Sequence, residues 1–94
     1  MRKSYLAGNW KMHKTIDEAV ALAKELVGAV SADDTNKKVM IAPPFTALAA
    51  VGEAVKGSPV LLGAQNMASE EKGAHTGEIS YVMLKDVGVS VVIL

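Results

Sequence analysis

The stretch SYLAGNWKMHKTIDEAV, residues 4–20, changes from the pattern of a strand to the pattern of a helix. Its apolar beginning stops at Gly8. Thr15 and Glu18 then have the spacing of a capping box, in which the residue before a helix and the third helical residue bond reciprocally. Apolar residues recur beyond this point at the spacing of a helix that lies on a sheet: Ile16, Ala19, Val20, Ala23, Leu26, Val27 and Val30. The stretch therefore predicts one unit of strand, connection and helix.

The same alternation continues along the chain. Short, nearly continuous apolar runs predict four strands, at Ser4–Gly8, Lys38–Ala42, Val60–Ala64 and Val89–Leu94. Runs of this kind are typical of strands that are covered on both faces. Because a helix connects most successive strands, we expect the strands to be parallel. The fold class predicted from this order is α/β, with a parallel sheet and alternating helices.

Two further helices are predicted between the later strands. The second helix begins near Thr46, after two prolines that forbid helix, and it ends before Pro59. The third helix is shorter, with Ser80 as its N-cap and Gly88 as its C-terminal stop. The residues expected to face the core are Leu48, Val51 and Val55 in the second helix and Met83, Leu84 and Val87 in the third.

Composition excludes several classes of function. The 94 residues suit one domain, and ten basic residues balance ten acidic ones, which gives no electrostatic reason to expect nucleic acid or a membrane surface as partner. The absence of cysteine excludes a disulfide framework, a thiolate zinc site and a cysteine nucleophile. No glycine-rich nucleotide motif occurs, and no apolar run is long enough to span a membrane.

Asn9 and Lys11 are the candidate site residues that position alone suggests. Both follow the first predicted strand, and parallel α/β folds place ligands at the carboxyl ends of their strands. An ammonium there can hold an anion or stabilise developing negative charge, and an amide can donate to a carbonyl oxygen. A solvent-facing lysine beside a turn asparagine is the alternative. His13 and His75 are interpreted as surface or interface residues and not as a metal pair.

Segment 65–79, QNMASEEKGAHTGEI, has no periodicity and interrupts the alternation. A loop of this length in a compact chain is commonly functional or disordered. Gln65 and Asn66 at its start are residue types that can bond their own backbone. The paired carboxylates Asp33-Asp34 and Glu70-Glu71 are interpreted as solvated turn residues. The fourth strand has nothing after it, so we expect the chain to be a piece of a larger fold.

Several motifs, in order and spread over the whole chain, resemble those of triosephosphate isomerases: AGNWKMHKT, APPFTAL, LGAQN, GAHTGEIS, MLKDVGV and the terminal VVIL. The resemblance implies an eight-stranded β/α barrel, of which residues 1–94 are the first four strands and three helices, with the C-terminal half absent. It implies an enzyme that interconverts dihydroxyacetone phosphate and glyceraldehyde 3-phosphate in glycolysis and gluconeogenesis. It also implies no cofactor or metal, and a cytoplasmic location.

The resemblance also implies roles for particular residues. Lys11 is the cation that faces the substrate and its enediolate, Asn9 lies beside the substrate oxygens and positions Lys11, and Trp10 supports both by packing. The long loop inserts into a pocket of a second, identical subunit. The residues implied at that dimer interface are Met12, Gln65, Asn66, Gly73, Thr76 and Glu78.

Two positions depart from the family pattern, and several parts are missing. His75 stands where an aromatic residue is usual and Tyr81 where proline is common; His75 suggests a pH-sensitive interface, because histidine titrates near neutrality. The electrophilic histidine and the glutamate base of the family lie beyond Leu94, so we expect the isolated chain to be inactive. Two alternatives stay open: a half-barrel that associates with itself or with a complementary C-terminal fragment, and a small flavodoxin-like domain that binds an anion.

Overall fold

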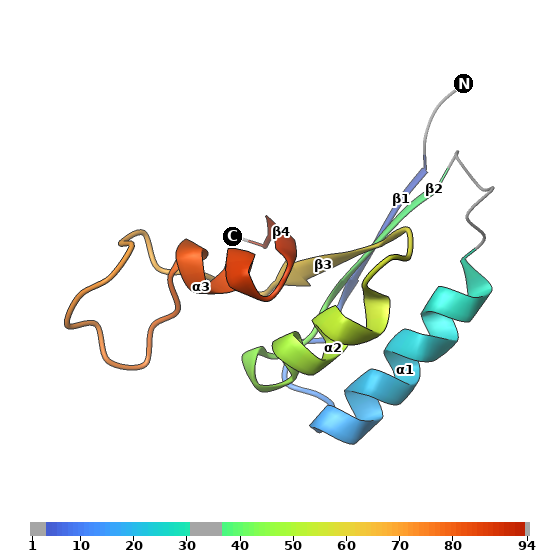
Figure 1. Ribbon diagram of the computed structural model, residues 1–94, viewed down its shortest axis with the longest axis horizontal. Coiled ribbons are helices and arrows are strands. Elements are labelled where there is room, and N and C mark those ends of the chain that lie inside the picture. The colour runs from blue at the N-terminus through green and yellow to red at the C-terminus, as the bar shows by residue number, and fades with distance from the viewer. Residues whose placement is uncertain (1–3, 31–36, 94) are drawn as a thin grey trace.

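The computed structural model describes residues 4–30 and 37–93. Strands and helices alternate through this part of the chain: β1 (Ser4–Asn9), α1 (Ile16–Ala29), β2 (Lys37–Ala42), a 3₁₀ turn (Phe45–Ala47) that leads into α2 (Leu48–Val55), β3 (Val60–Ala64), α3 (Tyr81–Asp86) and β4 (Val89–Val92). The strands pair in parallel in the order β1-β2-β3-β4 (Figure 1). The predicted elements and their parallel direction are confirmed. The predicted end of the last strand, Leu94, lies outside the described residues.

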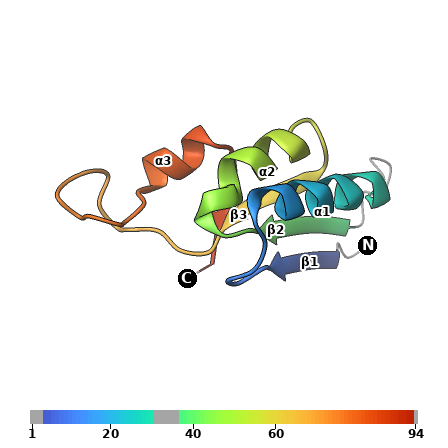
Figure 2. The same ribbon diagram turned by 90° about the horizontal axis from the view of Figure 1, so that it is seen from below.

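Helices α1 and α2 lie side by side on one face of the sheet (Figure 2). The core between these helices and the sheet includes Ala19 and Ala23 of α1, Val51 of α2, and Ile41 and Leu62 of the strands. Alanine on the buried face of α1 leaves room for a close approach, because its side chain is a single methyl group. The predicted inner residues of α2 are all buried.

The opposite face of the sheet carries no helix in the described part of the chain (Figure 2). Met40 is nevertheless buried, because its side chain lies over Gly63; a Cβ built on that glycine would collide with the Met40 sulfur. Neighbouring residues of a strand point to opposite faces, so Met40 and Ile41 line the two sides of β2.

Two residues predicted to face the core are exposed instead. Ile16 is 50% exposed, since it is the first residue of α1 and its turn extends beyond the packed part of the helix. Met83 is 54% exposed because α3 is short and buries mainly Leu84. The start of α1 is fixed as predicted: the Glu18 carboxylate accepts from the Thr15 N–H and from its hydroxyl, each at 2.9 Å. These bonds, the backbone one most strongly, lower the pKa of Glu18.

The sequential strand order contradicts the flavodoxin-like alternative. Doubly wound sheets of that kind begin with the order 2-1-3 and carry helices on both faces. A sheet in which each strand pairs with the next, with α1 and α2 on one face, is the arrangement that leads to a barrel. Among the described residues, no helix is both long and apolar enough to cross a membrane.

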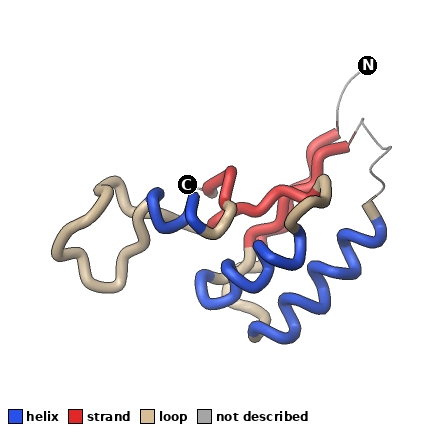
Figure 3. The backbone as a smooth tube through the Cα atoms, in the orientation of Figure 1, coloured by secondary structure: helices blue, strands red, loops and turns tan. Residues whose placement is uncertain are grey.

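Segment 66–79 projects from the rest of the domain as a loop without regular structure (Figures 1 and 3). The radius of gyration is 13.6 Å, whereas a compact chain of this length has about 12 Å. The projecting loop accounts for part of the difference. It extends away from β1 and α1 in both views (Figures 1 and 2).

Candidate functional site

The candidate site is built on the segment that follows β1. Pairing with β2 continues one residue past the strand, because the Trp10 N–H donates to the Ala42 carbonyl at 3.1 Å. The Trp10 side chain is half-buried and packs against the core. Lys11 then adopts a φ of 54°, in the left-handed region. A residue other than glycine costs about 1–2 kcal/mol there, so surrounding contacts must hold it.

Two side chains hold the backbone of Lys11 in this conformation. The Asn9 Oδ1 accepts a hydrogen bond from the Lys11 N–H at 2.9 Å. The Gln65 Nε2 donates to the Lys11 carbonyl at 2.8 Å and to the Ala42 carbonyl at 2.9 Å. The N–H and the carbonyl of Lys11 are therefore both bonded by side chains, one from β1 and one from the end of β3.

The role of Gln65 differs from the sequence-based interpretation. The sequence indicated a side chain that can bond its own backbone at the start of the loop; Gln65 reaches instead across the carboxyl ends of β1 and β2. The available signal was its place directly after Ala64, the last residue of β3. In a parallel sheet, polar residues that follow neighbouring strands gather at one edge, which brings Gln65 to Asn9 and Lys11.

The chemistry available at this edge is that of a cation on a held backbone. Lys11 and Asn9 are both exposed, so an incoming ligand can reach the ammonium without displacing the core. The Lys11 ammonium and the Asn9 amide group present donors to an anion or to an oxygen that gains negative charge, whereas both N–H donors of Gln65 already bond carbonyls. Among the described residues, no group of three or more histidine, cysteine, aspartate or glutamate side chains is arranged to hold a metal ion.

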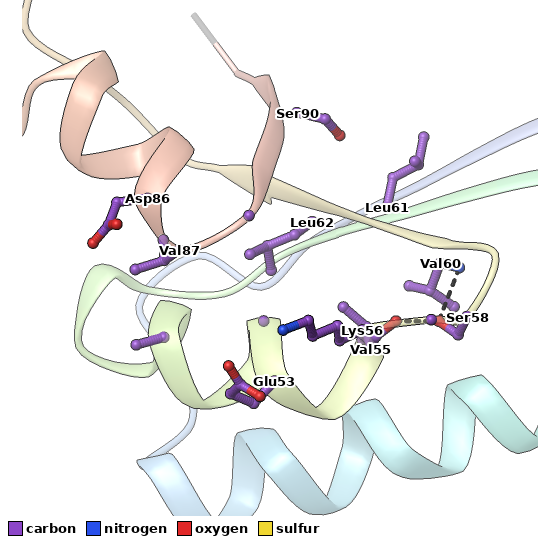
Figure 4. A pocket seen from close by; sticks show the side chains of 14 residues that line it. Glu53, Val55, Lys56, Ser58, Val60, Leu61, Leu62, Asp86, Val87 and Ser90 are labelled. Atoms are coloured by element: carbon purple, nitrogen blue, oxygen red, sulfur yellow. Dashed lines mark hydrogen bonds between the residues drawn. The ribbon is translucent and has the colours of Figure 1, made fainter.

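A cavity of about 410 Å³ lies elsewhere, between α2, β3 and the segment from α3 to β4 (Figure 4). It is bordered by Val60 and Gly88, at the amino ends of their strands, and so lies at the opposite end of the sheet from Lys11. Ser58, one of its polar residues, is already bonded within its own turn: its hydroxyl donates to the Val55 carbonyl at 2.6 Å and accepts from the Val60 N–H at 3.2 Å. The cavity is not part of the candidate site.

The remaining predicted site residues are exposed, and none of them makes one of the hydrogen bonds that hold the Lys11 backbone. Met12, next to Lys11, is 93% exposed. Asn66, Gly73, Thr76 and Glu78 belong to the projecting loop, and all four are exposed. The structure thus brings Asn9, Lys11 and Gln65 together and leaves the tip of the loop facing outward (Figure 1).

Comparison with known proteins decides the family. The family model for triosephosphate isomerase matches residues 4–94 of the chain. The chain belongs to the triosephosphate isomerase family. The triosephosphate isomerase of Treponema pallidum is 60% identical over all 94 residues, and that of Caldanaerobacter subterraneus is 54% identical over the same length.

A solved structure agrees with this assignment. The crystal structure of triosephosphate isomerase from Bartonella henselae superposes with a TM-score of 0.80 at 33% sequence identity, over 96% of this chain. The four parallel strands and their helices therefore match part of a β/α barrel, as predicted. The chain spans 37% of the length of the Treponema relative and 36% of the Bartonella chain.

Proposed function

We propose that residues 1–94 are the first four strands and three helices of a complete barrel that interconverts dihydroxyacetone phosphate and glyceraldehyde 3-phosphate. The observation that supports this most is the fixed backbone of Lys11 at the carboxyl end of β1. The backbone of Lys11 is held in the left-handed region by two side chains, and this conformation costs free energy. Conformational costs of this kind accumulate at functional sites. Its position is the one that barrel enzymes use for catalysis.

Lys11 acts in this proposal as the electrostatic partner of the substrate. Its ammonium attracts the anionic triose phosphate and stabilises the charge that develops on the enediolate oxygen. The Asn9 Oδ1 keeps the Lys11 N–H in place, while its amide group offers donors to a substrate oxygen. Asn9 and Lys11 are thus both substrate-binding and catalytic residues of the proposed enzyme.

Proton transfer requires groups that this chain does not supply. Moving a proton between two carbons needs a base and an acid within hydrogen-bond reach of the substrate. We place those groups in the part of the barrel that follows Leu94, and expect the 94 residues alone to be inactive. The proposed reaction uses no cofactor, belongs to glycolysis and gluconeogenesis, and takes place in the cytoplasm.

The test supplies the missing part. We define the completed barrel as this chain joined after Leu94 to the remaining part of the Treponema pallidum relative, which is 60% identical over the aligned residues. A coupled assay of glyceraldehyde 3-phosphate turnover should detect activity in the completed barrel and none in the isolated chain. Ordinary turnover by the isolated chain, or a folded but inactive completed barrel, contradicts the proposal.

We also propose a homodimer in which the loop of one subunit meets the segment after β1 of the other. Met12, Gln65, Asn66, Gly73, Thr76 and Glu78 are the residues proposed for this contact. Met12 supports this contact, because its large apolar side chain is 93% exposed and burial against a partner would lower the free energy. Sedimentation of the completed barrel should give twice the monomer mass.

Self-association of the isolated chain is a second candidate. In the described part of the chain, β1 and β4 pair on one side only, and the sheet has one face without helices. Unpaired strand edges and an uncovered sheet face favour pairing with another copy or with a complementary C-terminal fragment. Light scattering from the isolated chain tests this: a defined assembly supports it, and a stable monomer contradicts it.

A further inference from the structure

The projecting loop is tied at two places by its own backbone. At its base, the Ala68 N–H donates to the Ile79 carbonyl at 2.7 Å. At its tip, the Glu78 N–H donates to the His75 carbonyl at 3.0 Å and closes a turn. The His75 ring lies against Gly73, where a Cβ would stand 3.1 Å from the ring carbon Cδ2. These contacts hold the base and the tip of the loop, but they do not hold the stretch between them.

Tyr81 and Glu71 supply that support. The Tyr81 hydroxyl donates a hydrogen bond to the Glu71 carboxylate, across ten residues of chain. The acceptor is charged, which makes such a bond stronger than one between neutral groups. The same contact raises the pKa of Tyr81, because it stabilises the protonated hydroxyl. We call this pair the loop brace.

One end of the loop brace stands on a fixed element. Tyr81 is the first residue of α3. Leu84 anchors that helix with 2% exposure, and the Ser80 hydroxyl caps it by accepting from the Met83 N–H at 3.4 Å. Glu71, in contrast, lies in the exposed middle of the loop. The brace therefore ties a loop without regular structure to a residue whose backbone is already held.

The charges of the loop fit one surface of the same chain. Segment 66–79 carries three carboxylates and one ammonium, whereas segment 10–15 carries two lysines and no carboxylate. Residues 11–14 are all exposed. The loop extends away from this segment in its own chain (Figures 1 and 2). Contact between the two therefore requires a second copy, and a two-fold axis makes the contact twice.

We propose that the loop brace holds segment 66–79 in the shape that binds segment 10–15 of a second copy, so that Tyr81 and Glu71 set the affinity of the dimer. This inference rests on the proposed homodimer and names the residues that prepare it. Ordering a free loop on binding costs free energy. A loop that the brace already orders therefore loses less conformational entropy when it binds.

Trypsin provides a local measure of the brace. Lys72 is next to Glu71 and is the only lysine or arginine between Lys56 and Lys85. Cleavage after Lys72 requires the middle of the loop to open, so its rate reports how firmly the brace holds. The rate at Lys56 in the same digest is the internal reference.

The variants are compared in the completed barrel, at a concentration where all share one oligomeric state. Y81F keeps the ring and removes only the hydroxyl, and E71A removes the acceptor. Each should speed cleavage after Lys72 by about three- to tenfold. The double variant should be no faster than either single variant, because both remove one interaction. E70A, which removes the neighbouring carboxylate, should leave the rate unchanged.

The dimer is measured separately by sedimentation over a dilution series. Y81F should raise the dissociation constant by about ten- to a hundredfold, since each dimer contains two braces and their contributions multiply. Equal cleavage rates for wild type and Y81F, or additive effects in the double variant, overturn the brace. Faster cleavage with an unchanged dissociation constant overturns its link to the dimer. A wild-type completed barrel that stays monomeric rejects the proposed dimer, and cleavage then still decides the brace by itself.

Discussion

Replacing Gln65 with glutamate perturbs the contact that holds Lys11. In the wild type, the Gln65 side chain donates to the Lys11 carbonyl at 2.8 Å, in an exposed bond, and to the Ala42 carbonyl at 2.9 Å, in a partly buried bond. Losing the two bonds costs about 0.5 and 1 kcal/mol respectively, since water replaces the exposed one more fully. A carboxylate adds repulsion against both carbonyl oxygens, so we expect Q65E to lower the free energy of unfolding by about 2–3 kcal/mol.

The assay is urea unfolding of the completed barrel, followed by circular dichroism at one protein concentration. Q65M keeps the length of the side chain without charge or donor, and we expect it to cost about 1.5 kcal/mol. N66D introduces the same charge at the neighbouring residue, whose side chain makes neither of these bonds, and should change stability by less than about 0.5 kcal/mol.

The pH dependence separates repulsion from simple loss of a bond. A protonated carboxyl has one O–H that can again donate to a carbonyl. The stability deficit of Q65E should therefore be smaller at pH 5 than at pH 8, while that of Q65M stays constant. Equal stability of Q65E and N66D at both pH values would show that Gln65 does not hold the carboxyl ends of β1 and β2.

Two further substitutions test the packing and the helix cap. G52A should destabilise by about 1–3 kcal/mol, because the added Cβ would stand 2.5 Å from the Val87 carbonyl oxygen; G28A, at a position in α1 with nothing within 4 Å, should stabilise by about 0.5–1 kcal/mol through helix propensity. Thermal unfolding of both variants measures this, and equal signs contradict the close contact. The wild type should be more stable than E18Q at neutral pH. Since the folded pKa of Glu18 lies below its ordinary value of 4.5, this advantage is complete above that value and is lost as the pH falls through the folded pKa. If the stability difference between the wild type and E18Q does not change with pH, the ionised carboxylate of Glu18 does not stabilise the helix cap.

Local patterns were sufficient to predict most of the fold. The capping pair Thr15 and Glu18 fixed the start of α1, and apolar runs located every strand to within one or two residues in the described part of the chain. Exposure was harder to predict at Ile16 and Met83. Their burial depends on how far a neighbouring element extends, and helical spacing alone carries no information on that.

The site was predicted in part. Asn9 and Lys11 were placed by the rule that ligands meet the carboxyl ends of parallel strands. The contact of Gln65 with the Lys11 carbonyl spans 54 positions of sequence, and the left-handed backbone of Lys11 has no signature in a residue that is not glycine. The Tyr81–Glu71 contact was missed for a similar reason, because the path of an irregular loop is set by tertiary contacts.

In our proposal, this chain carries Lys11 to the rim of a closed barrel, where its charge acts on the substrate. The most direct measurement compares kcat and KM of K11M and K24M in the completed barrel. Lys24 is an exposed lysine of α1 and serves as the matched loss of charge. We predict that K11M lowers kcat/KM at least about 100-fold and that K24M leaves it unchanged. Equal activity of the two variants would contradict this role of Lys11.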